Sequence, residues 1–303
     1  MVMRITNNMM VNNLMRNLYR NMNVLDETEE KLASGRTVQV PSDNPIAVTN
    51  TLRWRTNLAE VNEYLEKVRE AGNWLNTADS ALDSLTSILQ RVRELTVYGA
   101  NGSLAPTDRA AIAKEVDQLA EQVGQIANTT YGAKYIFGGT NTTAPPYDPT
   151  TYDLSTGTGW QGNDQEFRLE VAQGALLTVN SPGSVIFNGT GGTPRLFKVL
   201  KDLSDNLVSG DTAGLNQRLQ EIDQNIDNVL NERAVVGAKL NRLELHQTRL
   251  EDLEKNYTEL LAQSEDADLA EVIMNLKMQE NVYRASLAAG ARIIQPTLVD
   301  FLR

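Results

Sequence analysis

Residues 58–82 decide the fold, and they read LAEVNEYLEKVREAGNWLNTADSAL. Apolar or small residues recur in this stretch at alternating steps of three and four, and the same spacing returns from Leu215 onward. Such a spacing places one apolar stripe along a helix, which is the seam of a coiled coil or a helix bundle. The first stripe comprises Leu58, Val61, Leu65, Val68, Gly72, Leu75 and Leu82; the second comprises Leu215, Leu219, Ile222, Ile226, Val229, Val236, Leu240, Leu243, Leu250 and Tyr257.

The middle of the chain has a different composition. Residues 141–194 are rich in Gly, Thr, Pro and Asn, so they predict strands and turns. Apolar and polar residues alternate at 167–171 and at 177–179, as in half-buried strands, and we expect further strands at 131–137 and 185–187. The sequence therefore predicts a mainly α chain with an inserted β domain: a long antiparallel helical bundle or coiled coil formed by both chain ends, with a small β-rich head.

Two breaks divide the helical arms. The run PSDNP at 41–45 interrupts the N-terminal arm, because proline cannot continue a helix, and residues 264–266 interrupt the C-terminal arm. We therefore expect three domains. Residues 1–45 plus 265–303 form a terminal helix pair, the inner assembly domain; residues 46–140 plus 195–264 form a helical rod; residues 141–194 form the head.

Composition limits the partners. The 303 residues carry 39 acidic and 28 basic side chains, a net charge of −11, which disfavours nucleic acid and anionic membranes as partners. No apolar run approaches the ~20 residues that span a bilayer, so we expect no membrane insertion. Residues 1–20 lack the apolar core and the cleavage site of a secretory signal peptide. The chain has no cysteine, which excludes disulfides and thiolate nucleophiles.

Little in the sequence points to catalysis. The single histidine, His246, has no second His or Cys with which to share a metal ion, and no nucleophile-elbow sequence is present. We therefore predict no catalytic, cofactor-binding or metal site. Carboxylates near aromatic residues in the head leave a sugar site open as an alternative; they are Asp153, Asp164 and Glu166, near Tyr147, Tyr152 and Trp160.

The two ends of the chain pose a question of assembly. Each carries a helix with one apolar face, and such a pair alone buries little area and should be marginally stable in a monomer. Neighbouring copies that cover the stripes would stabilise the pair, and a head-to-tail interface of this kind builds rings or helical filaments. The predicted assembly interface comprises Leu14, Leu18, Met22, Leu25, Leu269, Ile273, Leu276, Tyr283, Leu287, Ile294, Leu298 and Phe301.

Short motifs at both ends resemble those of the bacterial flagellin family. They are KLASGR at 31–36, PSDNP at 41–45, DADLAE at 266–271 and the run at 298–303. Asn44 stands where the family commonly has Asp. Three features resemble the members of the family that join the hook to the filament: the Pro-Ser-Asp-x-Pro form, the segment YIFGGT at 135–140 with the two prolines that follow it, and the tail QPTLVDFL at 295–302.

This resemblance implies a structural protein rather than an enzyme. It implies a homo-oligomer in a helical ring, with a neighbouring hook-associated junction protein and flagellin as partners, and a cytoplasmic export chaperone. It also implies an extracellular location, at the hook–filament junction of the bacterial flagellum, after type III export without a cleaved signal peptide. The alternatives are a flagellin filament subunit and, more remotely, an exported carbohydrate-binding or adhesive protein.

Overall fold

A computed structural model describes residues 7–38, 44–101, 104–189 and 192–294 of the chain. Internal contacts divide it into two compact units, Val61–Asp252 and the two ends, Met1–Glu60 with Leu253–Arg303. These limits run through two long helices, α2 (Pro45–Gly99) and α6 (Thr212–Glu265), rather than through the predicted breaks. The division into three domains stays a prediction.

The apolar stripes of α2 and α6 form the core of the unit Val61–Asp252. The helices run antiparallel there, since Arg233 pairs with Asp79 at 3.1 Å and Arg93 pairs with Asp223 at 2.6 Å. Asp211 caps α6, because its carboxylate accepts the backbone N–H groups of the first turn. Several residues of the two predicted stripes have no exposed surface: Leu75, Leu82, Leu215, Ile222, Val229 and Val236. The predicted mainly α fold with a helical bundle is confirmed.

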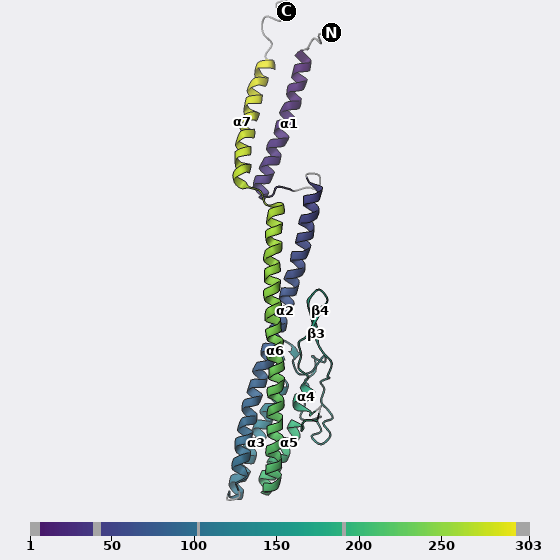
Figure 1. Cartoon of the computed structure of the whole chain (residues 1–303), viewed down its shortest axis with the longest axis vertical. Coiled ribbons are helices and arrows are strands. Elements are labelled where there is room, and N and C mark those ends of the chain that lie inside the picture. The colour runs from purple at the N-terminus through teal and green to yellow at the C-terminus, as the bar shows by residue number, and fades with distance from the viewer. Residues whose placement is uncertain (1–6, 39–43, 102–103, 190–191, 295–303) are drawn as a thin grey trace, which may run out of the picture. The chain divides into compact units, whose positions relative to one another are not determined.

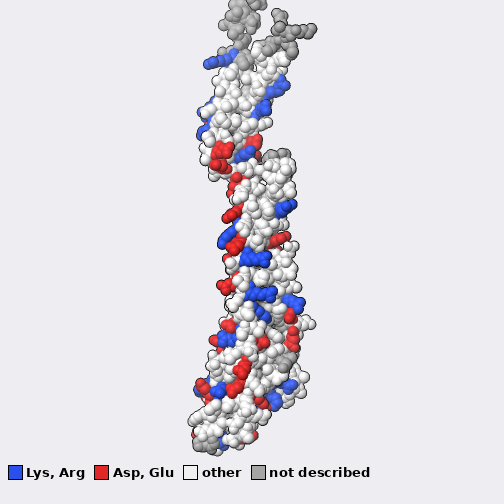
Figure 2. Space-filling model, viewed as in Figure 1, with Lys and Arg blue, Asp and Glu red and all other residues white. Residues whose placement is uncertain are grey.

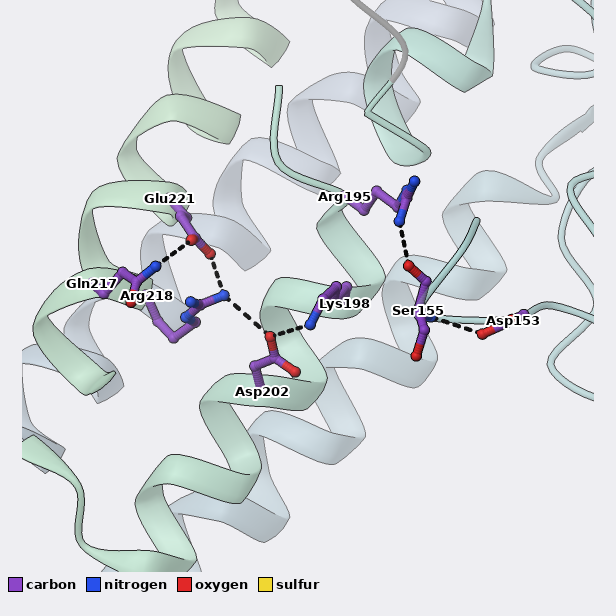
Figure 3. Close-up of polar contacts among 8 residues, drawn as sticks. All are labelled: Asp153, Ser155, Arg195, Lys198, Asp202, Gln217, Arg218 and Glu221. Atoms are coloured by element: carbon purple, nitrogen blue, oxygen red, sulfur yellow. Dashed lines mark hydrogen bonds and ion pairs between the residues drawn. The ribbon is translucent and has the colours of Figure 1, made fainter. Parts of the chain in front are cut away.

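Two further helices complete the bundle of this unit, α3 (Pro106–Ala127) and α5 (Leu196–Ser209), which pack against each other (Figure 1). A polar network then joins α5 to α6 (Figure 3). The Asp202 carboxylate pairs with Lys198 at 2.7 Å and with Arg218 at 3.1 Å, and Arg218 also pairs with Glu221 at 2.6 Å. The Arg218 side chain is only 14% exposed, so its charge needs these carboxylates nearby.

Short strands and one short helix lie between α3 and α5, some of them in the inserted segment 141–194. Strands β1 (Thr130–Tyr131) and β2 (Lys134–Tyr135) form one antiparallel hairpin, and β3 (Arg168–Ala172) and β4 (Ala175–Thr178) form another. The predicted strands at 167–171 and 177–179 therefore lie close to β3 and β4. In Figure 1 the β3–β4 hairpin extends from the rest of the segment.

Two of the predicted strands are wrong. Residues 131–137 do not form one strand, because the chain turns at Gly132, where φ is +58° and glycine is strongly favoured. Residues 185–187 belong to the helix α4 (Gly183–Phe187). Neighbouring side chains Ile186 and Phe187 are both buried, so the segment does not have the one-sided burial that alternation of apolar and polar residues would predict.

Phe187 is the centre of an aromatic cluster under the inserted segment. Its ring centroid lies 5.4 Å from that of Phe137, 5.8 Å from that of Trp160 and 6.1 Å from that of Phe197. Tyr147 stacks on Phe197 at 4.0 Å. Since Phe137 and Phe197 lie outside residues 141–194, the inserted segment shares its core with the helices beside it.

Tyr152 at the edge of this cluster gives a pH-dependent prediction. Burial raises its pKa from the ordinary value near 10 to about 12, and its hydroxyl donates to Asn188 Oδ1 at 2.7 Å. Because the folded-state pKa lies above the unfolded one, Tyr152 stabilises the fold below about pH 10 and loses this contribution as the pH rises toward 12. Phenolate absorbance should show a late titration step that Tyr152→Phe lacks. A difference spectrum with the step at the ordinary value would contradict the burial argument.

Candidate assembly surface

The first and last helices pair along one seam. Helices α1 (Asn7–Ser34) and α7 (Leu269–Ile294) lie side by side and antiparallel (Figure 1). Asn21 Nδ2 donates to Ser286 Oγ at 3.0 Å in the middle of the pair. Near its far end Gly290 is buried, and a Cβ there would lie 2.8 Å from Leu14 Cδ2. The helices therefore approach closely at this point, and a larger residue at 290 would force the end of the Leu14 side chain to shift.

Backbone hydrogen bonds join the other ends of the two helices. Gly35 ends α1 at φ +70°, and its carbonyl accepts the Ala267 N–H at 2.9 Å. The Thr37 N–H donates to the Glu265 carbonyl at 2.8 Å. Asp268 then caps α7 by accepting the Ala270 N–H at 2.9 Å. The motifs at 31–36 and 266–271 thus meet at this joint.

The Glu265 carboxylate is the charged centre of the joint. Its side chain is 6% exposed, and Oε1 pairs with both Arg36 and Arg55. Next to it, Thr51 and Ser264 share a hydrogen bond of 3.1 Å, and the Trp54 and Tyr257 rings stack with centroids 5.8 Å apart. The buried carboxylate thus holds Arg36 and Arg55, one on each side of the break at 41–45, beside the end of α6.

Replacing Glu265 with Gln should open this joint. The change removes the negative charge that both arginines share; the arginines are 51% and 42% exposed, so the cost is that of lost hydrogen bonds to a charged group, about 1.5–3 kcal/mol. We expect faster proteolysis at 35–44 and 264–268 and lower hydrogen-exchange protection in the first turn of α7. The matched control is Glu27→Gln, whose carboxylate is 58% exposed and pairs with Lys31 within one helix. Equal proteolysis of both variants would rule out a structural role for the Glu265 charge.

Both helices also carry apolar side chains on the surface. On α7, Met274, Met278 and Val282 follow one another at steps of four and are 66%, 52% and 42% exposed. At 100° per residue, Met274 and Met278 lie on the side of α7 opposite the buried Leu276. On α1, three residues flank the seam, Met15, Tyr19 and Met22, with 42%, 59% and 44% exposure. The visible face of this helix pair is largely uncharged (Figure 2).

Comparisons with known proteins match both ends of the chain. The family model described as the bacterial flagellin N-terminal helical region matches residues 5–142, and the one described as the bacterial flagellin C-terminal helical region matches residues 219–302. This chain belongs to the bacterial flagellin family. The two matched regions contain α1, α7 and the joint between them.

Relatives in the flagellin family span nearly the whole chain. The flagellar hook-associated protein 3 of Escherichia coli K12 is 25% identical, over 95% of this chain and 96% of that protein. The flagellin of Bacillus subtilis is also 25% identical, over 97% of each chain. Among solved structures, Bacillus cereus FlgL is 25% identical with a TM-score of 0.59, and the match covers 69% of this chain and 99% of that one.

The predicted interface residues of this flagellin-family chain fall into two groups. One group is buried or half-buried in the α1–α7 pair and comprises Leu14, Leu18, Leu25, Leu276 and Tyr283; the other is exposed and comprises Met22, Leu269, Ile273 and Leu287. The side chain of Ile294, and all of Leu298 and Phe301, lie outside the described residues. The prediction missed the exposed Met274, Met278 and Val282. The spacing of four residues between these side chains could have identified them, because residues four apart lie on one face of a helix.

The head carboxylates are engaged by their own loops. Asp153 accepts hydrogen bonds from the Thr156 hydroxyl and the Ser155 N–H, which lower its pKa. A hydrogen bond from Arg168 lowers the pKa of Glu166. Asp164 accepts from the Ser184 hydroxyl. Asp153 and Glu166 therefore stabilise local structure, and Asp164 links its loop to α4.

A metal site finds no support in the part of the chain that the structure describes, where no three His, Cys, Asp or Glu side chains are grouped to hold an ion. Of the described helices, none has both the length and the apolar character needed to cross a membrane.

Proposed function

We propose that this chain is a structural subunit of the bacterial flagellum, which forms the junction between hook and filament by helical self-assembly of its terminal helices. Family membership, the relative named flagellar hook-associated protein 3 and the match to FlgL support this function. The motif forms at 41–45, 135–140 and 295–302 favour the junction over the filament shaft.

The proposed assembly mechanism rests on one observation: α7 carries apolar side chains on two opposite sides. The seam with α1 covers the side of Leu276, which is 8% exposed, whereas Met274 and Met278 on the other side are more than half exposed. Exposed apolar side chains grouped on one face of a helix mark an interaction surface. Burial of apolar surface contributes about 25 cal/mol per Å², so neighbouring copies that cover this second side gain free energy by assembling.

The proposed interface therefore includes residues in both groups, with different roles. Exposed residues, among them Met22, Ile273 and Leu287, contact neighbouring subunits directly. Seam residues, among them Leu14 and Leu276, hold α1 against α7, so that the pair presents its outer faces as one surface.

Partners and location follow from the same proposal. The chain forms a helical ring with copies of itself, between a hook-associated junction protein and flagellin, outside the cell. It leaves the cell through the flagellar type III apparatus, with the help of a cytoplasmic chaperone. The similar proteins are structural parts of the flagellum, and we propose no enzymatic activity for this chain.

Two other functions compete with this one. A filament subunit would share the fold, and the Bacillus subtilis flagellin covers as much of the chain as the hook-associated protein does. A carbohydrate-binding head would use the carboxylates of 153–166, but these are occupied by hydrogen bonds within the head, and Trp160 stacks on Phe187.

Immuno-electron microscopy of isolated flagella separates the first two functions. An antibody against this chain should label a short band where the hook meets the filament. Cells without the gene should keep their hooks, lose their filaments and release flagellin into the medium. Label along the whole shaft would identify a filament subunit and overturn the junction assignment.

A further inference from the structure

The methionines of this chain are confined to its two ends. All eight lie at positions 1–22 or 274–278, and none occurs between Met22 and Met274. The six described ones are all exposed, between 42% and 66%: Met9, Met10, Met15, Met22, Met274 and Met278. The unit Val61–Asp252 contains no methionine, although its core is large.

This distribution concentrates the oxidisable side chains on the proposed assembly surface. The chain has no cysteine, so no thiol competes for two-electron oxidants such as peroxides. Thioether oxidation turns a flexible apolar side chain into a polar one. On the outer face of α7 it would place sulfoxides beside Val282, where the proposed function requires an apolar surface.

We propose that these six methionines are a modification site, through which peroxide-class oxidants reversibly block assembly. The inference rests on the proposed function. In each event the sulfur takes one oxygen from hydrogen peroxide, a water molecule leaves, and the peroxide is reduced as the thioether becomes a sulfoxide. Methionine sulfoxide reductases reverse the change with two electrons from a dithiol reductant, which becomes a disulfide, and the sulfoxide oxygen leaves as water. The rod contains no methionine, so the oxidised chain keeps its rod folded while its terminal faces become polar.

The spacing of the methionines shows which faces of α1 and α7 would become polar on oxidation. Met274 and Met278 share one face of α7 with Val282, and Met15 and Met22 share one face of α1 with Tyr19. Burial of a sulfoxide without a hydrogen-bond partner is unfavourable, as it is for other polar groups. Several sulfoxides on one subunit would therefore act together against assembly.

The test adds purified chain to cells that lack the gene and whose hooks are exposed to the medium, and then counts filaments. Chain treated with hydrogen peroxide should restore at least roughly tenfold fewer filaments than untreated chain, because polar groups replace apolar contacts. Mass spectrometry should find added oxygens on the methionines, including the six described ones, and the melting midpoint of the rod should not change. Both sulfoxide reductases together, supplied with a dithiol reductant, should restore assembly.

A matched variant tests whether the methionines cause the loss of assembly in peroxide. Replacing all six with Leu keeps size and polarity, so peroxide should no longer reduce its filament count, whereas replacement with Gln should imitate oxidation without peroxide. If the Leu variant loses assembly in peroxide as the native chain does, or if oxidised native chain assembles normally, the inference is overturned. If untreated native chain restores no filaments, the proposed junction function is wrong, and the inference that rests on it is overturned as well.

Discussion

Cells whose only copy of this gene carries Met274→Asp should make hooks without filaments. Met274 is 66% exposed in the monomer and lies on the outer face of α7, which we assign to contacts between subunits. A carboxylate buried there without a partner costs several kcal/mol. At about 4 kcal/mol, each contact weakens roughly a thousandfold.

The same change should leave the monomer intact. The side chain lies on the opposite side of α7 from Leu276 and is 66% exposed in the monomer, so the new carboxylate stays in water there. Circular dichroism should show the native melting midpoint, and the variant should reach the medium in normal amounts. Flagellin should appear in the medium as unassembled protein.

Two control variants test whether the loss of filaments arises at the outer face of α7. Leu276→Asp changes a residue two positions away on the buried side, 8% exposed, and should unpair α1 from α7 and lower hydrogen-exchange protection in both. Leu176→Asp changes an exposed Leu on β4, 55% exposed, and should leave filaments normal. Normal filaments on exported Met274→Asp would show that the outer face of α7 is not an assembly surface.

Phe187→Ala should cause the largest loss of stability in the unit Val61–Asp252. The side chain has no exposed surface, and its ring contacts those of Phe137, Trp160 and Phe197. Loss of a buried Phe costs about 3–5 kcal/mol through lost burial and the cavity left behind. For a unit of this size the melting midpoint should fall by roughly 10 °C.

This experiment also tests whether the inserted segment shares its core with the bundle. Far-UV and aromatic signals should melt together at the lower midpoint, since the Phe137 and Phe197 rings belong to both. Leu176→Ala on the exposed surface of β4 is the matched control and should change stability by less than about 0.5 kcal/mol. A Phe187→Ala protein whose helices melt at the native midpoint would indicate an independent head.

Helix positions were predictable because their signals are local. The spacing of Leu58, Leu65 and Leu75 predicts one seam, Gly35 and Gly210 end helices in the left-handed conformation, and Asp211 begins the next one. Residues 185–187 were not predictable in this way. Their alternation suggested a strand, but the cluster around Phe187 places Ile186 and Phe187 in the core together, and packing decides such short segments more than local preference does.

By itself, the sequence determined that both ends of this chain are amphipathic helices, that a small irregular segment is inserted between long helices, and that the family is that of flagellin. These properties depend on residues near one another in the chain. The tertiary structure alone decided which apolar residues the monomer covers, because an apolar stripe does not specify what packs on it. It placed Leu276 in the seam and left Met274 exposed. It also brought Glu265 to Arg55, 210 positions away, because only the folded chain returns its two ends to one joint.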